Sequence, residues 1–255
     1  MSLPLDPGAL PPQLRVDASD RSRGIRITLQ RVPHCVNVVD CGGALADQTP
    51  IRTLEFVVVD VETTGGSWLH GDRVTEIAAV RVRGDGAVLD EYRTLVNPER
   101  PIPCGITALT NITGDMVYRA PPFRDVAADV ARVLAGAVFV AHNASFDWRF
   151  VHAELDRAGW PLIGRTLCTV RLARKVVPEI RSRSLDALSY FFNVHNEARH
   201  RAYGDARATA VIFRRLLDWL DTRAVTRWDE LELLLLRRSQ RRKRLANPHW
   251  APDPW

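Results

Sequence analysis

The sequence predicts an α/β domain built on a mixed five-stranded sheet with helices on both faces. Apolar segments of strand-forming residues occur at 56–59 and 138–141. Two alternating segments, 77–82 and 88–96, flank a Gly-Asp-Gly turn at 84–86, which indicates a β-hairpin. Helical periodicity follows the second apolar segment, so the order strand, hairpin, helix, strand, helix is that of an α/β layer.

The 255 residues are enough for one domain with extensions at both ends. We expect the domain at 54–221 and an N-terminal extension at 1–53, partly disordered because its first 23 residues are rich in proline, glycine and charge. Alternating apolar residues predict a small hairpin within 24–40. Residues 222–255 are expected to form a basic helical tail, with a helical pattern at 228–236.

The tail contains a dense run of positive charge. Six of the eight residues at 237–244 are Arg or Lys, a pattern that could follow a nucleic-acid backbone or form a solvated helix end. Gln240 is followed by basic residues where a sliding-clamp motif needs hydrophobic ones. That absence argues against proofreading within a replicative holoenzyme.

Two carboxylates stand two residues apart at the exit of the first apolar segment. Alternate side chains of a strand point to the same face, so Asp60 and Glu62 can approach one point. Such a pair is poorly hydrated and mutually repulsive, and divalent cations with oxygen ligands are the usual compensation. The alternative is ordinary: Asp60 caps the strand end and Glu62 is a surface acid.

A third acid leads the apolar face of a predicted helix. Asp147 is in line with Phe150, Val151 and Leu155, and Ser145 is the expected N-cap. An aspartate in this position points inward, where an isolated charge is costly. The alternative is a first-turn acid that the helix dipole favours.

A fourth acid repeats this arrangement. Asp205 stands near the start of a helix, in line with Thr209 and Ile212, and His200 falls in the preceding loop. His200 could also be a plain member of a basic loop, since Arg199 and Arg201 flank it. Acids at inward-facing positions of three separate elements together predict a metal site.

These residues lie in three motifs, DVETTG at 60–65, NASFD at 143–147 and HRAYGD at 200–205. With supporting segments at 73–80, 95–98 and 106–113, they resemble the DEDDh (DnaQ-like) branch of 3′–5′ exonucleases, with a likeness to the epsilon proofreading subunit of bacterial DNA polymerase III. The resemblance covers residues 54–220. The sister branch has tyrosine at the place of Arg201, so the histidine branch is indicated.

The resemblance implies a ribonuclease H-like fold and hydrolysis assisted by two metal ions. Asp60 would bridge both ions, Glu62 and Asp205 would complete the tighter site, and Asp147 would serve the second ion. His200 would be the general base, a role that suits an unperturbed pKa near ~6.5. Mg²⁺ is the expected cofactor and Mn²⁺ a substitute, because both favour carboxylate and water ligands.

The resemblance also implies substrate contacts. The backbone of Thr63, Thr64 and Gly65 would hold the terminal nucleotide, and Ile106 or Leu109 would wedge against the penultimate base. Asn143 and Phe146 complete the predicted set, which comprises Thr63, Thr64, Gly65, Ile106, Leu109, Asn143 and Phe146. The alternatives are that 63–65 form an ordinary strand-to-loop turn and that the helix with Ile106 and Leu109 is buried. Likewise, Asn143 could order its turn and Phe146 could belong to the core.

Composition is consistent with these expectations. The four cysteines form no CxxC pair, which argues against a zinc site, and no apolar stretch is long enough to span a membrane. We therefore expect a cytoplasmic protein without a membrane partner. A net charge of +5 favours polyanionic partners.

Three functions follow from the sequence. The first is a DNA 3′–5′ exonuclease in replication proofreading or repair, acting on single-stranded or frayed 3′ ends, with a DNA polymerase subunit as a partner. The second is an RNA-trimming exoribonuclease, because the same site can act on either phosphodiester and the residues do not reveal discrimination at the 2′-hydroxyl. The third is a catalytically silent, polymerase-associated nucleic-acid-binding module, against which the five intact residues argue.

Overall fold

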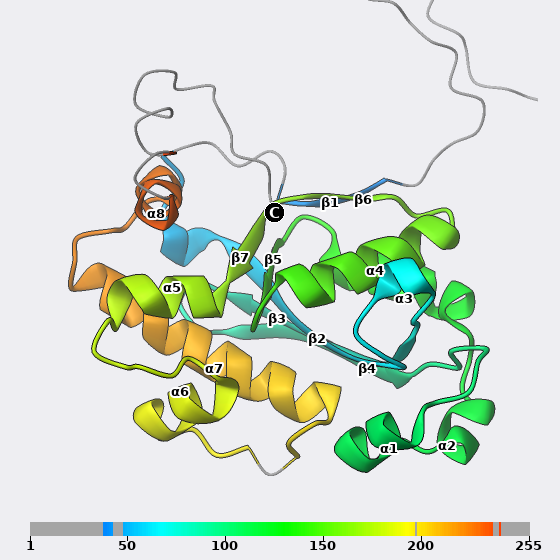
Figure 1. Ribbon diagram of the computed structural model, residues 1–255. Helices are drawn as coiled ribbons and strands as arrows, with labels where there is room; N and C mark the ends of the chain where they lie inside the picture. Colours follow the sequence, from blue (N-terminus) through cyan, green and yellow to red (C-terminus); the bar gives the residue numbers. More distant parts are fainter. Residues whose placement is uncertain (1–37, 43–47, 197, 237–239, 241–255) are drawn as a thin grey trace, which may run out of the picture. The chain divides into compact units, whose positions relative to one another are not determined.

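The computed structural model describes residues 38–42, 48–196, 198–236 and 240 (Figure 1). Its centre is a five-stranded sheet in the order β4-β3-β2-β5-β7. The β2–β3 and β3–β4 pairs are antiparallel, and the β2–β5 and β5–β7 pairs are parallel, so the sheet is mixed as predicted. The strands are β2 (Glu55–Thr63), β3 (Val74–Arg83), β4 (Val88–Leu95), β5 (Val138–Ala141) and β7 (Thr166–Cys168).

The predicted hairpin is the β3–β4 pair. Its turn closes through hydrogen bonds from Arg83 N to Ala87 O (2.8 Å) and from Gly86 N to Arg83 O (2.8 Å). Gly86 has a φ of +98°, a conformation that favours glycine. The turn therefore sets the register that places Glu76 of β3 opposite Leu95 of β4.

Helices cover both faces of the sheet, as predicted. One face carries α5 (Thr169–Val176), α6 (Leu185–Phe192), α7 (Ala202–Asp221) and α8 (Trp228–Leu235). The other carries α3 (Phe123–Leu134) and α4 (Ser145–Arg157). Shorter segments are α1 (Cys104–Thr110), α2 (Gly114–Tyr118), η1 (Ile51–Thr53) and η2 (Trp68–His70).

Strand β2 divides its side chains between the two cores. Phe56 and Val58 pack in the α7 core, whereas Val57 and Val59 pack in the α3–α4 core, and all four are fully buried. This explains why the segment reads as an unbroken apolar run: a strand with helices on both faces has no solvent side.

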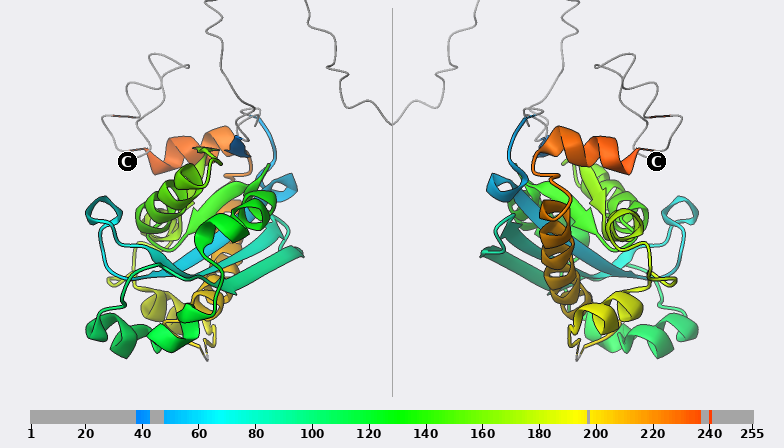
Figure 2. Two further views of the ribbon diagram at one scale, coloured as in Figure 1. Left: turned by 90° about the vertical axis from the view of Figure 1, so that its right-hand side faces the viewer. Right: turned by 90° about the vertical axis from the view of Figure 1, so that its left-hand side faces the viewer.

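The packed domain extends beyond residue 221. Trp228 and Leu231 of α8 are buried in the α7 core, and α8 lies across the C-terminal end of α7 (Figure 2). The helix predicted at 228–236 is thus confirmed, and it is part of the fold. The basic run at 237–244 lies outside the described residues except for Gln240.

The hairpin predicted within 24–40 stays a prediction, because only the last three residues of that segment are described. Most of 24–40 lies outside the described residues. Its end belongs to β1 (Val39–Cys41), which pairs in parallel with β6 (Leu162–Gly164) to form a separate two-stranded sheet. Val39 and Cys41 are buried in the α3–α4 core, so a distant partner, which the local pattern could not reveal, determines this strand. Among the described residues, no helix is long and apolar enough to cross a membrane.

Candidate active site

Three carboxylates from β2 and α7 meet at one end of the sheet. Asp60 and Glu62 continue the row of β2 side chains that faces α7, and both are half-buried. Asp205 is buried in the first turn of α7. The oxygens that Asp60, Glu62 and Asp205 offer lie within 4.8 Å of one another.

Asp147 reaches the same region from α4, on the other face of the sheet. Only 3% of it is exposed, and its Oδ1 accepts a hydrogen bond from the backbone N of Val61 at 3.2 Å. Val61 lies between Asp60 and Glu62, so this bond ties the first turn of α4 to the acidic end of β2. The predicted apolar face of α4 is confirmed, but Ala144 rather than Ser145 is the N-cap, and no side chain caps the helix.

Burial and mutual repulsion raise the pKa values of three of these carboxylates. Burial, followed by repulsion from Asp205, raises the pKa of Glu62 to about 7. Burial also raises the pKa of Asp147 to about 8, although the hydrogen bond from Val61 opposes the rise. The pKa of Asp60 lies well above its usual range, because of burial first and then the charge of Asp147.

This donor set fits a divalent cation. Carboxylates held this close cannot all be charged at neutral pH without a counter-charge, and the three that converge supply only oxygen ligands. Hard cations such as Mg²⁺ and Mn²⁺ favour such ligands, whereas zinc and copper favour sites containing sulfur or imidazole.

Asp205 is the most heavily bonded of the four acids. Its Oδ1 accepts from Asn196 Nδ2 (2.5 Å) and Arg199 Nη1 (2.9 Å). Its Oδ2 accepts from Arg199 Nη1 (3.0 Å) and the backbone N of His200 (3.2 Å). The loop before α7 is therefore folded onto this carboxylate.

His200 lies in that loop, as predicted, two residues before the start of α7. It is half-buried, and its φ of +58° is uncommon for a residue with a side chain. The bond from its backbone N to Asp205 stabilises this conformation. The loop thus couples the position of His200 to that of a candidate metal ligand.

Glu76 is a residue that the sequence reading passed over. It is only 6% exposed and stands opposite Glu62 in the β2–β3 pair. Its carboxylate accepts from Arg201 Nε (3.0 Å) and Nη2 (2.7 Å) and from the backbone N of Ala202 (2.9 Å). Glu76 therefore caps the first turn of α7. The sequence could have indicated this role, because an acid inside an otherwise apolar strand requires a partner.

His142 is a second residue near the site that the sequence did not single out. It follows β5, and its Nδ1 lies 2.9 Å from Thr169 Oγ1 at the start of α5. Burial lowers its pKa, so the ring favours the neutral form. This contact joins β5 to the helix after β7 beside the acidic end of the sheet.

The predicted nucleotide-binding turn is closely built. Thr63 Oγ1 donates to the carbonyl of Gly65 at 2.6 Å, and Thr64 Oγ1 donates to Asp72 Oδ1 at 3.2 Å. A Cβ at Gly65 would collide with the Asp72 carboxylate, and that carboxylate also accepts from Ser67 N at 3.0 Å. Glycine is thus the residue that lets the loop close after β2.

The other predicted substrate contacts differ in their surroundings. Leu109 of α1 is 51% exposed and Ile106 is half-buried, so α1 is not a buried helix and both residues offer apolar surface. Asn143 has a φ of +70°, and its carbonyl accepts from Phe146 N at 3.0 Å, so Asn143 orders its turn. Phe146 packs on Phe150 with 4.9 Å between ring centroids.

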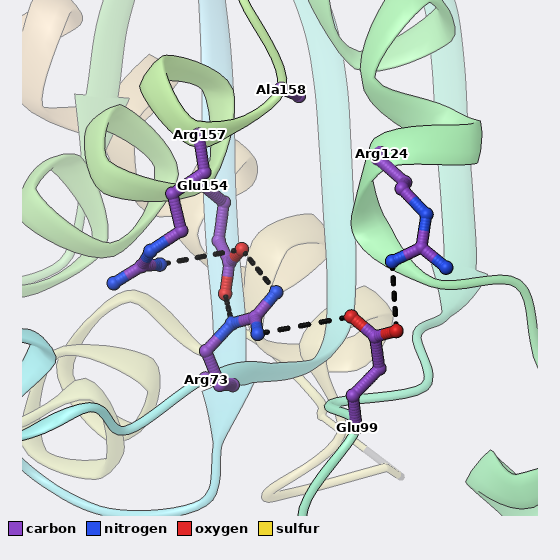
Figure 3. Close-up of a pocket in the computed structure, with 6 residues that line it drawn as sticks. All are labelled: Arg73, Glu99, Arg124, Glu154, Arg157 and Ala158. Atoms are coloured by element: carbon purple, nitrogen blue, oxygen red, sulfur yellow. Dashed lines mark hydrogen bonds and ion pairs between the residues drawn. The ribbon is translucent and has the colours of Figure 1, made fainter.

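A second charged cluster lines a pocket at the far end of α4 (Figure 3). The buried Glu154 accepts from Arg73 at 2.6 and 2.9 Å and pairs with Arg157 at 3.5 Å. Glu99 pairs with Arg124 at 2.8 Å and with Arg73 at 4.0 Å. Glu154 follows Asp147 by seven residues, roughly 10 Å along the helix. Ion pairs join its three arginines and two glutamates, so the cluster braces α4 against the start of β3.

Comparison with known proteins agrees with this fold and identifies the family. The sequence profile of the exonuclease family RNase_T matches residues 57–213. The chain is 42% identical over 188 residues to a DNA polymerase III subunit epsilon-like protein of Rhodobacter capsulatus, covering 72% of this chain and 27% of that protein. It is 42% identical over 166 residues to the 3′–5′ exonuclease DinG of Bacillus subtilis, covering 65% and 18% respectively. The chain therefore spans less than a third of the length of either relative.

Solved structures show the same architecture. Exonuclease X in complex with 5′ overhanging duplex DNA aligns with a TM-score of 0.54 and 30% identity, covering 71% of this chain and 99% of that one. Exonuclease I of E. coli in complex with a dA16 oligonucleotide aligns with a TM-score of 0.54 and 19% identity, covering 67% and 43%, and supports the fold alone.

The fold and the acidic centre define an α/β protein of ribonuclease H-like architecture with a carboxylate site suited to divalent cations. The chain belongs to the RNase_T exonuclease family.

Proposed function

We propose that the chain is a metal-dependent 3′–5′ exonuclease of the DEDDh type that removes nucleotides from DNA 3′ ends. The observation that carries this proposal is the convergence of Asp60, Glu62 and Asp205 within 4.8 Å, with Asp147 bonded to the same strand end. Family membership and the names of the relatives support nuclease chemistry, and DinG in particular supports 3′–5′ polarity.

Asp60, Glu62 and Asp205 would hold one cation, and Asp60 with Asp147 would hold a second. Two bound Mg²⁺ ions, or Mn²⁺ in their place, would neutralise the phosphodiester charge and acidify the attacking water. Sharing this positive charge would relieve the mutual repulsion of the four carboxylates. That relief would tie ion binding to the stability of the fold.

His200 would take the proton from the attacking water at a ring nitrogen. Its loop is fixed by the bond from its backbone N to Asp205, so the base and a metal ligand move together. General-base catalysis needs a group that can reach the proton by a hydrogen bond, directly or through one water. The backbone of Thr63 to Gly65 and the exposed Leu109 would hold the 3′-terminal nucleotides.

DNA is the proposed substrate because the relatives carry the names of DNA polymerase III proteins and because exonuclease X is solved with duplex DNA. Proofreading or repair beside a DNA polymerase is the corresponding role.

The test is degradation of matched oligonucleotides labelled at the 5′ end: single-stranded DNA, a duplex with a mispaired 3′ end, and RNA. We expect a ladder of products shortened from the 3′ end on both DNA substrates with Mg²⁺, and no product with chelator. Release of the label as a mononucleotide from the outset would show 5′–3′ polarity and contradict the proposal. Faster loss of RNA than of DNA would favour the exoribonuclease, and inactivity on all three would favour a silent binding module.

A further inference from the structure

One arginine bridges the proposed metal ligand and a neighbouring helix. Arg199 Nη1 lies 2.9 and 3.0 Å from the two oxygens of Asp205. On its other edge, Nε lies 2.5 Å and Nη2 2.9 Å from the oxygens of Asp186. The guanidinium is thus shared between the first turn of α7 and the first turn of α6.

The two carboxylates that share Arg199 differ in exposure. The side chain of Asp205 is 8% exposed, whereas that of Asp186 is 67% exposed. Asp205 lies in the acidic centre, and Asp186 lies at the surface. The guanidinium therefore extends from solvent to the edge of the proposed metal site, held on the outer side by a bidentate pair.

We propose that Arg199 competes with the cation for Asp205 and thereby sets the metal affinity of the centre. This inference rests on the proposed function, since it assigns a positioning role beside the same ligands. In the metal-free chain the guanidinium neutralises Asp205. In the ion-loaded chain, Asp205 would share its negative charge with the cation, and Asp186 would retain the arginine at the rim.

The physical argument is a balance between two positive charges. A guanidinium and a divalent ion on the same carboxylate repel one another, and at a separation of about 4 Å that repulsion is substantial even with strong screening. Asn196 and the backbone N of His200 keep the Asp205 carboxylate oriented without Arg199. Removing the arginine charge should therefore strengthen cation binding, because the ligand geometry has independent support.

Asp186 works in the opposite direction. The Asp186 carboxylate accepts two hydrogen bonds from Arg199. Asp186 therefore weakens the interaction between Arg199 and Asp205. Neutralising Asp186 would leave Asp205 as the main partner of Arg199, and the cation would face a stronger competitor. The effect must pass through Arg199, and it should shrink when that arginine is absent.

The experiment is titration calorimetry of the full chain with Mn²⁺ alone. Compared with wild type, Arg199→Gln should bind Mn²⁺ about tenfold more tightly. Arg199→Lys, which keeps the charge, should stay close to wild type. Asp186→Asn should bind more weakly, and the same substitution in the Arg199→Gln background should change the affinity much less. Arg174→Gln is the matched control, because Arg174 is an exposed arginine on α5.

Equal or weaker binding by Arg199→Gln would overturn the inference, provided that its near-ultraviolet circular dichroism matches wild type. If that variant fails to fold, the Asp186→Asn arm decides alone: affinity equal to or above wild type overturns the competition. Absence of Mn²⁺ binding in wild type would instead contradict the proposed metal centre itself, so the two failures are distinguishable.

Discussion

Glu62 and Glu76 stand directly opposite one another in the antiparallel β2–β3 pair. Like charges at such a position destabilise a sheet, so each carboxylate needs its own compensation. Glu76 obtains it from Arg201 and from the N-terminus of α7. Glu62 has a pKa raised to about 7 by burial and by its acidic neighbours, which is consistent with a ligand that a cation completes.

Replacing Glu76 tests its role as the cap of α7. Glu76→Ala leaves Arg201 and the N–H of Ala202 without their acceptor, so the free energy of unfolding in chelator should fall by about 2 kcal/mol. Urea denaturation measures this change. Glu99→Ala, which breaks more exposed ion pairs with Arg124 and Arg73, is the control and should cost less than about 1 kcal/mol. Equal losses in the two variants would show that Glu76 is an ordinary ion-pair residue.

Removing Asp60 tests the metal centre. Asp60→Ala should abolish hydrolysis, because the residue is proposed to contact both ions. The melting temperature in chelator should stay level or rise, since one repulsive charge is gone. Asp156→Ala, at an exposed acid on α4, should leave both quantities unchanged. Turnover by Asp60→Ala at the wild-type rate would contradict the two-metal proposal.

His200→Ala tests the general base. Turnover should drop by roughly 10²–10⁴-fold, and the pH–rate profile should flatten near neutrality. Mn²⁺ affinity should change little, because His200 bonds to Asp205 through its backbone N, which alanine retains. His70→Ala is the control, at an exposed histidine on η2. Loss of Mn²⁺ binding in His200→Ala would reassign His200 to the metal ligands.

The stability of the metal-free protein should depend on pH through the buried acids. Folding raises the pKa of Glu62 from 4.5 to about 7 and that of Asp147 from 3.8 to about 8. Between these values the folded state binds more protons than the unfolded state, so this contribution is present at low pH and is lost as pH rises from about 4 to 8.

Thermal melts in chelator at pH 5 to 8 measure that loss. The melting temperature should fall more steeply with pH for wild type than for the Glu62→Gln/Asp147→Asn protein. Saturating Mg²⁺ should remove most of the difference between the two slopes of melting temperature against pH. The reason is that the cation would neutralise the charge of the carboxylates. Parallel slopes in chelator would mean that these two acids do not titrate in this range.

The basic run at 237–244 is tested by truncation after Leu236. An earlier cut would remove Trp228 and Leu231 from the core and would confuse unfolding with loss of contacts. If the run follows the strand backbone, truncation should raise the apparent KM for long single strands. Each lost phosphate contact should lower the log–log salt slope by roughly 0.7. Unchanged KM and slope would make the run a solvated helix end or a dock for a protein.

The sequence predicted the central sheet and the convergence of the acids, because those depend on local periodicity. Alternation in β3 and β4 and the turn at 84–86 determine the hairpin, and the inward faces of α4 and α7 determine where Asp147 and Asp205 point. Local periodicity could not predict which distant segments pair with one another. Nothing in Val39–Cys41 indicates Leu162–Gly164 as its partner. Likewise, the bonds of Arg199 to Asp186 and Asp205 depend on how α6 and α7 dock, which periodicity does not specify.

The separation of Asp60 and Asp205 along the chain has a consequence for biosynthesis. A ribosome-bound chain that has completed the β2–β3–β4 hairpins already presents Asp60 and Glu62, yet Asp205 and His200 are still to be made. The centre closes only when α7 docks on the finished sheet. A nascent or prematurely terminated product would therefore be inert toward the nucleic acids around it, and nuclease competence would arrive together with the native fold.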